Sequence, residues 1–181
     1  MLFGAGQDAI PVAQFAKALG WQVTLVDCQA RESTPVRFPM ADQVILTRRE
    51  IVHQQIQINA NTIAVVMTHN YLDDAQLLKM LLSSSVRYIG MLGPKHRTER
   101  LLQTLQQDSI NIDQAQTRLH APVGLDLGSD TPEAIALSII AEIQAVLAKR
   151  SGGFLRNRQG AIHPQSTALP SEELLCLQSV L

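Results

Sequence analysis

The sequence is poor in aromatic residues and has no excess of charge of either sign. Aromatic residues make up only 4% of its 181 residues, whereas 46% are hydrophobic, so a core has to be built from aliphatic side chains and alanine. Such a core is typical of α/β and helical folds. Fifteen basic residues stand against 16 acidic ones. This balance argues against binding of nucleic acid through a basic surface.

Cysteine and long apolar runs are also scarce. Cys28 and Cys176 are too few for a disulfide-built secreted scaffold and lack zinc-binding spacing, although a disulfide between them stays open. No basic segment followed by an apolar stretch resembles a signal peptide. No apolar run reaches the ~20 residues that cross a bilayer. These absences predict a reduced, cytoplasmic protein that does not enter a membrane.

Short β-branched runs alternate with longer helical stretches, which predicts an α/β fold with a three-layer, doubly wound, mostly parallel sheet of Rossmann type. The clearest helix is Pro132–Lys149, and Thr131 is placed to cap it. The predicted strands are Met1–Phe3, Val23–Asp27, Val44–Leu46, Ile63–Met67, Val86–Ile89 and Leu119–Val123. The predicted helices are Ala9–Leu19, a short one within Arg48–Gln57, Asp73–Leu82, Pro94–Gln106 and Pro132–Lys149.

The pattern predicts one domain over residues 1–153, followed by a partly irregular tail over residues 154–181 in which Glu172–Leu181 has the pattern of a short helix. The first strand has only three residues before Gly4. Buried strands usually have ~5–6 residues. We therefore expect this strand to be truncated or completed from elsewhere.

A glycine-rich turn follows the first strand, where Gly4, Gly6 and Ala9 give the GxGxxA form of the dinucleotide fingerprint. Asp27 ends the second strand, where an acid meets a ribose diol in such sites. Arg31 suits either a 2′-phosphate or solvent, so the choice between NAD and NADP stays open. The alternative is a Rossmann turn that has lost its ligand. The residues expected to bind a cofactor here are Gly4, Gly6, Gln7, Asp8 and Asp27.

A polar segment follows the apolar run Ile63–Met67. Ligands of open parallel sheets bind beyond the carboxyl ends of the strands, where the strand order reverses. Because the first and fourth strands are expected to be neighbours there, Thr68 and His69 should face the glycine-rich turn. The segment Thr68, His69 and Asn70 is therefore predicted to contact the ligand. The alternative is that Thr68 or Asn70 only caps the next helix while His69 points to solvent.

Basic residues crowd the first turns of the helix predicted after Gly93, where the helix dipole disfavours them. Lys95, Arg97 and Arg100 therefore indicate an anion site. The alternative is a solvated helix in which Glu99 pairs with Lys95. Farther along, Asp126 suits either a ligand contact or a turn. The residues predicted to bind the cofactor in these two segments are Gly90, Gly93, Lys95, Arg97 and Asp126.

Several sequence segments, in their order along the chain, resemble those of a known family. They are FGAGQDAIP from Phe3, followed by Asp27; RFP-x-AD at Arg37–Asp42; MTHNYLDD at Met67–Asp74; IGMLGPKHRTERL at Ile89–Leu101; and HAPVGLDLGSDTPEAIALSIIAEI at His120–Ile143. Over Leu2 to Gly153 the chain resembles the Rossmann-like C-terminal domain of the XdhC/CoxI family, accessory factors for xanthine dehydrogenase and related molybdenum hydroxylases.

The resemblance implies a protein that binds molybdenum cofactor (molybdopterin) and assists its insertion into a molybdenum hydroxylase such as xanthine dehydrogenase. It also implies contact with a cysteine desulfurase. Whether the protein forms a homodimer stays open. An accessory, non-enzymatic role is favoured over an NAD(P)-dependent oxidoreductase, because only 28 residues (181 − 153) follow Gly153 to form a substrate domain. A nucleotide-sensing domain and a ligand-free docking scaffold are the remaining alternatives.

Overall fold

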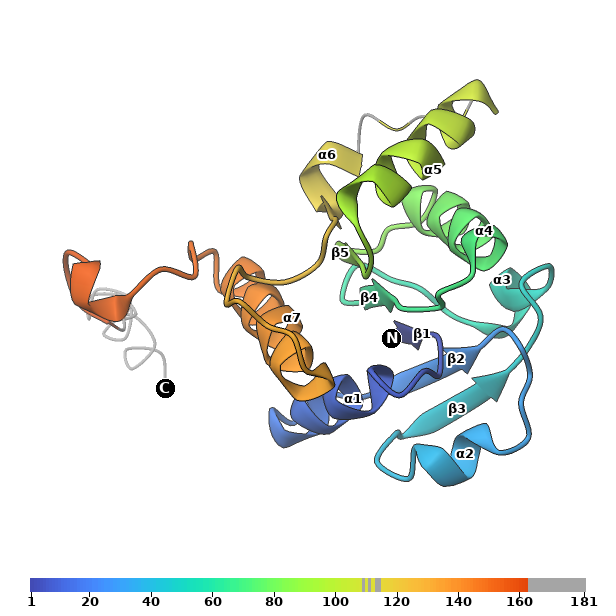
Figure 1. Ribbon diagram of the computed structural model, residues 1–181, viewed down its shortest axis with the longest axis horizontal. Helices are drawn as coiled ribbons and strands as arrows, with labels where there is room; N and C mark the ends of the chain where they lie inside the picture. Colours follow the sequence, from blue (N-terminus) through green and yellow to red (C-terminus); the bar gives the residue numbers. More distant parts are fainter. Residues whose placement is uncertain (109, 111, 113–114, 163–181) are drawn as a thin grey trace, which may run out of the picture.

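The protein is described by a computed structural model, in which residues 1–108, 110, 112 and 115–162 are placed. Six parallel strands form one sheet in the order β3-β2-β1-β4-β5-β6, with helices on both faces (Figure 1). This confirms the predicted α/β class. The strands are β1 Leu2–Phe3, β2 Thr24–Asp27, β3 Gln43–Leu46, β4 Ile63–Val66, β5 Tyr88–Met91 and β6 Leu119–His120. The helices are α1 Ala9–Ala18, α2 Thr34–Arg37, α3 Val52–Gln55, α4 Tyr71–Leu82, α5 Lys95–Gln107, α6 Ala115–Arg118 and α7 Pro132–Leu147, followed by the 3-10 turn η1 Leu155–Asn157.

Neighbouring residues of the central strands pack into two separate hydrophobic cores, one on each face of the sheet. In β1, Leu2 packs with α1 and α7, whereas Phe3 packs with α4 and α5. In β4, Val65 joins the first core and Val66 the second. Successive side chains of a strand point to opposite faces, so a strand buried on both faces has to be apolar throughout. The continuous apolar runs in the sequence therefore reflect the two layers of helices.

The strand order reverses between β1 and β4, which pair in register at Phe3 and Val66. The backbone N–H of Met67 donates to the carbonyl of Phe3 at 2.7 Å. The carboxyl ends of these two strands therefore lie side by side. The glycine-rich loop and the segment after Met67 both emerge at this edge, as the sequence predicted, and this edge is where doubly wound sheets bind ligands.

Several predicted bounds were wrong. The strand predicted at Leu119–Val123 ends at His120, because Pro122 has no N–H to continue the ladder. Helix α4 begins at Tyr71, two residues before the predicted start, since the Asn70 side chain accepts the N–H groups of Leu72 and Asp73. The four-residue helices α2 and α6 were not predicted at all, because one turn is too short to show a helical period.

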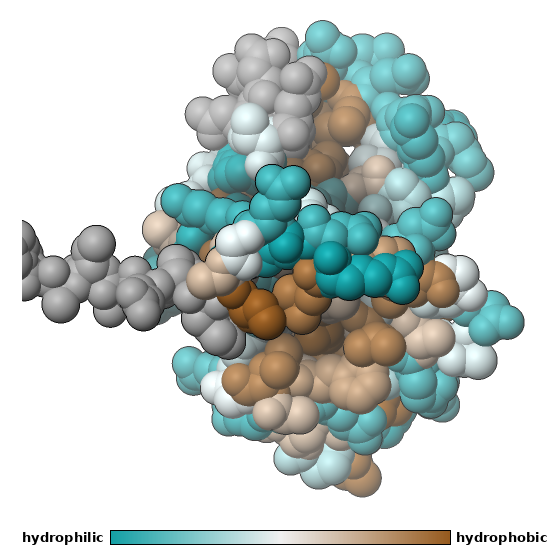
Figure 2. All heavy atoms as spheres, turned by 90° about the vertical axis from the view of Figure 1, so that its left-hand side faces the viewer, coloured by the Kyte–Doolittle hydropathy of each residue, from teal (hydrophilic) through white to brown (hydrophobic). Residues whose placement is uncertain are grey.

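Helix α7 has the predicted cap, in which Thr131 Oγ1 accepts the N–H of Ala134 at 3.2 Å. The chain then leaves the body, and apolar side chains gather on the face from which it departs (Figure 2). Phe154 and Leu155 are exposed in this segment. The predicted terminal helix Glu172–Leu181, which contains Cys176, lies outside the described residues. Among the helices that the structure places, none is long and apolar enough to span a membrane.

Candidate ligand-binding site at the carboxyl edge of the sheet

The turn after β1 depends on Gly4 for steric reasons. Its φ is +111°, and a β-carbon added there would lie 2.4 Å from the carbonyl oxygen of Met67. The Gly4 N–H donates to the carbonyl of Val26 at 2.9 Å, which holds the turn between β2 and β4. Gly4 is therefore needed for the backbone of one strand to pass close to its neighbour.

An acidic side chain covers the second glycine of this loop. A β-carbon on Gly6 would lie 2.4 Å from Asp8 Oδ1, and the other carboxylate oxygen, Oδ2, lies 2.7 Å from His69 Nε2. Asp8 Oδ1 is buried and has no hydrogen-bond partner in the described structure. In dinucleotide-binding folds the second glycine allows pyrophosphate to approach. Here the protein's own carboxylate lies at that position, while Gln7 beside it is exposed.

His69 is brought against the glycine-rich loop, as expected from the strand order. Its backbone lies in the left-handed region, with φ +57°, and its side chain is 61% exposed. Such φ values are uncommon for residues other than glycine. The backbone after β4 is thus held in an unusual conformation that places an accessible imidazole beside Asp8.

Asp27 turns inward and is held by the protein's own donors. Its side chain is 1% exposed, and Oδ2 accepts from Thr34 Oγ1 at 2.7 Å and from Arg31 Nε at 3.0 Å. Oδ1 accepts from the Gln29 N–H at 3.0 Å and from Arg31 Nη2 at 3.2 Å. Burial alone would raise the pKa of Asp27, but the hydrogen bonds from Arg31, Thr34 and Gln29 hold it below its ordinary value. Sequence reasoning missed this arrangement and considered only a ligand or solvent for Arg31.

Arg37 connects α2 to the glycine-rich loop, a role that the sequence did not reveal. Its Nη1 donates to the carbonyl of Ala5 at 2.9 Å, and its guanidinium lies 5.7 Å from the ring centre of Phe38. Phe38 is 1% exposed. Helix α2 is thus anchored to Asp27 through Thr34 at its start and to the loop through Arg37 at its end.

The start of α4 holds a buried carboxylate that Thr68 and Arg97 share. Thr68 Oγ1 donates to Asp74 Oδ1 at 2.5 Å, and Arg97 Nη2 donates to Asp74 Oδ2 at 2.5 Å. Burial raises the pKa of Asp74, partly offset by these two neighbours. Arg97 Nε is buried without a hydrogen-bond partner in the described residues. Arg97 therefore ties α5 to α4.

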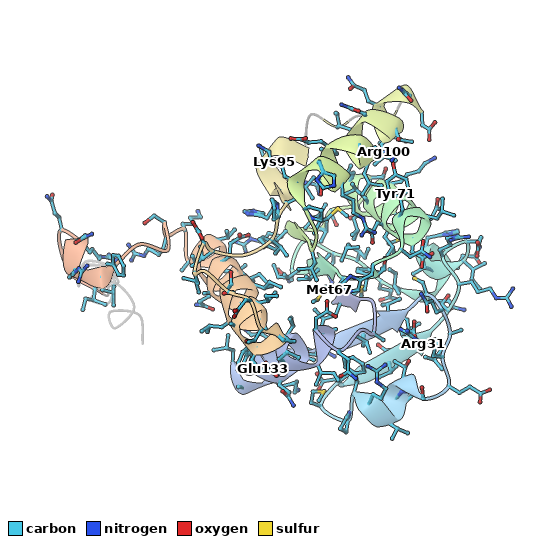
Figure 3. The ribbon with its side chains drawn as sticks, in the orientation of Figure 1. Arg31, Met67, Tyr71, Lys95, Arg100 and Glu133 are labelled. Carbon is cyan, nitrogen blue, oxygen red and sulfur yellow. The ribbon has the colours of Figure 1, made fainter. Side chains whose placement is uncertain are left out.

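The other cations of α5 also have partners within the protein. Lys95 Nζ lies 3.9 Å from Glu99 Oε1, with both side chains well exposed. The Arg100 guanidinium lies 5.6 Å from the ring centre of Tyr71 (Figure 3). Lys95 and Arg31 lie on opposite sides of Met67 in this view. The contacts account for these cations without a bound anion, and the anion site at α5 stays a prediction.

The remaining predicted residues are spread around the edge. Gly90 lies within β5, where a β-carbon would meet Val123 Cγ2 at 2.6 Å, and Gly93 adopts φ +135° in the turn before α5. Asn70 uses its side chain to cap α4. Asp126 is exposed in the loop before α7. Their predicted contacts with a cofactor stay predictions.

Two features near the edge escaped the sequence analysis. Arg49 Nη1 donates to Asp73 Oδ1 at 2.9 Å, which ties the segment after β3 to α4. Burial, together with the nearby carboxylates of Asp73 and Asp27, raises the pKa of the Cys28 thiol to about 12. A thiol with such a pKa is a poor nucleophile. Residues distant in sequence make these contacts, so local patterns could not reveal them.

A third missed feature is a buried cluster under α7. Glu142 accepts hydrogen bonds from the Tyr88 hydroxyl at 2.5 Å and from the Gly124 N–H at 2.8 Å, and it lies 2.8 Å from His120 Nδ1. The rings of Tyr88 and His120 stack with centres 4.4 Å apart. This cluster joins α7 to β5 and β6, and it explains why an acid interrupts an apolar helix.

Two cavities of about 580 and 560 Å³ lie at the opposite, amino edge of the sheet. Asn61 and Arg87 contribute to both cavities, and Trp21 and Leu147 line only the second. No group of three or more His, Cys, Asp or Glu side chains in the described part of the chain is placed to hold a metal ion. At the carboxyl edge, charged and polar side chains lie in pairs, such as Asp8 with His69 and Asp74 with Arg97.

The fold and this edge define a Rossmann-type domain in which Asp8 and His69 are paired over the glycine-rich loop. The model of the XdhC Rossmann domain matches residues 1–143. The chain therefore belongs to the XdhC Rossmann domain family.

The chain is also similar to two individual proteins and to one solved structure. The chain is 38% identical over 143 residues to a probable xanthine dehydrogenase subunit of Bacillus subtilis (strain 168), covering 79% of this chain and 41% of that protein. It is 27% identical over 156 residues to the uncharacterised protein YqeB of Escherichia coli (strain K12), covering 86% and 28%. A crystal structure described as a xanthine dehydrogenase from Bacillus halodurans is 32% identical, with TM-score 0.71 over 90% of this chain and 44% of that chain. The chain spans less than half the length of each of these three relatives.

Proposed function

We propose that this domain is an accessory module that binds the pterin of the molybdenum cofactor at the carboxyl edge of its sheet and assists delivery of the cofactor to a xanthine dehydrogenase-type enzyme. Membership of the XdhC family and the B. subtilis relative support the link to xanthine dehydrogenase. The cofactor supplies the recipient enzyme with its redox-active molybdenum.

The observation that carries the proposal is the unpartnered oxygen of Asp8. Asp8 Oδ1 is buried beside Gly6 and accepts no hydrogen bond from the described residues. A buried acceptor without a donor is costly, so a ligand that brings N–H groups is favoured. A pterin ring presents adjacent N–H and NH₂ donors, which suit a carboxylate acceptor. A phosphate at the same position would meet a like charge.

His69 completes this part of the site. Its imidazole contacts Asp8 through Oδ2, so that Oδ1 is the carboxylate oxygen without a donor among the described residues. At 61% exposure, the ring is also accessible to a bound molecule. Asp8 would therefore accept from the pterin, while His69 fixes the direction in which the carboxylate points.

Dinucleotide binding is the second candidate, and the Gly4–Gly6 loop at the reversal of strand order favours it. Asp27 counts against it, since both of its carboxylate oxygens already accept hydrogen bonds from Arg31. A ribose diol would have to displace these donors. The pterin is therefore the better candidate for this edge.

A delivery assay tests the function. Purified xanthine dehydrogenase from a host that lacks the cofactor is mixed with free cofactor, with or without this chain, and the rate of activation is measured. We expect the chain to accelerate activation, and we expect Asp8→Asn to reduce the acceleration by about tenfold. The matched control is Asp108→Asn, which removes an exposed acid at the carboxyl end of α5, outside the candidate site. Activation that is equally fast without the chain, or with Asp8→Asn, would contradict the proposal.

A further inference from the structure

The side of the site formed by β2 and α2 differs from the diol-binding site of a dinucleotide fold. In such folds the acid that ends the second strand binds the ribose hydroxyls. Here Asp27 is 1% exposed and accepts hydrogen bonds from the Arg31 and Thr34 side chains and the Gln29 N–H at 2.7 to 3.2 Å. Its acceptor capacity is directed into the protein. This side presents the Arg31 side chain, 39% exposed, to solvent together with the exposed Glu32.

A second guanidinium lies at the same edge. Arg37 is half-buried and fixed to the Ala5 carbonyl, and Ala5 follows β1, the strand next to β2. The four-residue helix α2 begins at Thr34, which holds Asp27, and ends at Arg37. The segment from Arg31 to Arg37 is thus held at the end of β2 through Asp27 and at the end of β1 through the Ala5 carbonyl.

Both arginines keep unused donors. A guanidinium has five N–H groups. Arg31 uses Nε and Nη2 on Asp27, and Arg37 uses Nη1 on Ala5. Within the described residues, Arg31 Nη1 and Arg37 Nη2 donate to no acceptor. Fixed guanidinium groups with unused donors are the preferred partners of phosphate oxygens.

We propose that Arg31 and Arg37 form a binding site for a phosphomonoester group, and that Asp27 positions Arg31 instead of contacting the ligand. The inference rests on the proposed function in one respect: a ligand whose donor-rich ring meets Asp8 would place its phosphate at these arginines. The 2′-phosphate of a dinucleotide and the phosphate of a pterin share this chemistry.

The test compares two pairs of probes that differ only by one phosphate: 6-hydroxymethylpterin with its phosphate ester, and NAD with NADP. Dissociation constants are measured by calorimetry for the wild type, Arg31→Gln, Arg37→Gln and the control Arg87→Gln. Arg87 is exposed and lines the cavities at the opposite edge. Thermal melts of each variant establish that it is folded.

We expect the phosphorylated member of at least one pair to bind about tenfold more tightly or better. This advantage should fall to within about threefold in Arg31→Gln and Arg37→Gln and persist in Arg87→Gln. An advantage confined to NADP would keep the phosphate site but contradict the pterin proposal. Pterin binding without a phosphate advantage would keep the proposed function and overturn the phosphate site. Absence of any phosphate advantage, or one that both variants retain, overturns this inference.

Discussion

His69 Nε2 lies 2.7 Å from Asp8 Oδ2, although 61 residues separate the two in sequence. The pair joins the loop after β1 to the segment after β4, at the point where the strand order reverses. The φ of His69 is +57°, which glycine adopts more readily. Histidine at this position makes the contact with Asp8 that glycine could not make, although its backbone is strained by the positive φ.

This relationship predicts separate effects of His69→Gly on stability and on binding. Glycine relieves the positive φ by about 1–2 kcal/mol, while the lost hydrogen bond between His69 and Asp8 costs about 0.5–1.5 kcal/mol. The free energy of unfolding in urea should therefore change by no more than about 1 kcal/mol. Binding of 6-hydroxymethylpterin phosphate should weaken by about tenfold, because Asp8 loses the group that orients it. Unchanged binding would show that His69 does not serve the site.

Gly4→Ala should destabilise the fold far more than Gly128→Ala. The added methyl at Gly4 would lie 2.4 Å from the Met67 carbonyl oxygen, whereas at Gly128 nothing lies within 4 Å. Gly128 has φ +65°, within the left-handed region, so its variant measures a backbone strain of about 1 kcal/mol without a steric clash. We expect about 3 kcal/mol or more for Gly4→Ala in chemical unfolding. Equal losses of unfolding free energy in the two variants would mean that the backbone at Gly4 does not lie close to the Met67 carbonyl.

Asp27 should contribute to the acid sensitivity of the protein. Its pKa in the folded protein is lowered below its ordinary value of 3.8, so its stabilising effect is present above that value and is lost as the pH falls through the folded pKa. Asp27→Asn should lower stability at pH 7 by about 1.5–3 kcal/mol and flatten the decline below pH ~4. Urea unfolding from pH 7 to pH 3 measures both, with Asp126→Asn as control. An acid limb as steep as in the wild type would refute the assignment.

The cluster under α7 predicts unequal effects of two tyrosine substitutions. Tyr88 is fully buried, and its hydroxyl donates to the Glu142 carboxylate at 2.5 Å. Tyr88→Phe should therefore cost about 1.5–3 kcal/mol. The Tyr71 hydroxyl lies 3.4 Å from Thr104 Oγ1 at an exposed position, so Tyr71→Phe should stay within about 0.5 kcal/mol. Thermal unfolding compares the two, and a loss for Tyr71→Phe that matches Tyr88→Phe would contradict this ranking.

Much of the fold followed from local patterns. The apolar run at Ile63–Met67 predicted a buried strand, and the alternation of strands and helices predicted that β1 and β4 would be neighbours. Thr131 predicted the start of α7. These features depend on residues close in sequence or on general rules of chain topology, which is why the sequence sufficed.

The candidate site was only partly predictable, because its decisive contacts join distant residues. The sequence placed His69 near the glycine-rich loop but did not reveal that Asp8 covers Gly6. It marked Asp27 as a ligand residue, yet could not show that the side chain turns inward onto Arg31. Which of several donors satisfies a carboxylate depends on tertiary packing, and sequence spacing leaves that choice open.

Binding of the pterin at the carboxyl edge is tested directly by mapping which residues contact it. Backbone amide signals of the ¹⁵N-labelled chain are followed by NMR while 6-hydroxymethylpterin phosphate is added. The largest shifts are expected at the carboxyl edge, at Gly6, Asp8 and His69. Shifts concentrated instead on Trp21 and Arg87, at the cavities of the amino edge, or no shifts at all, would contradict binding at the carboxyl edge.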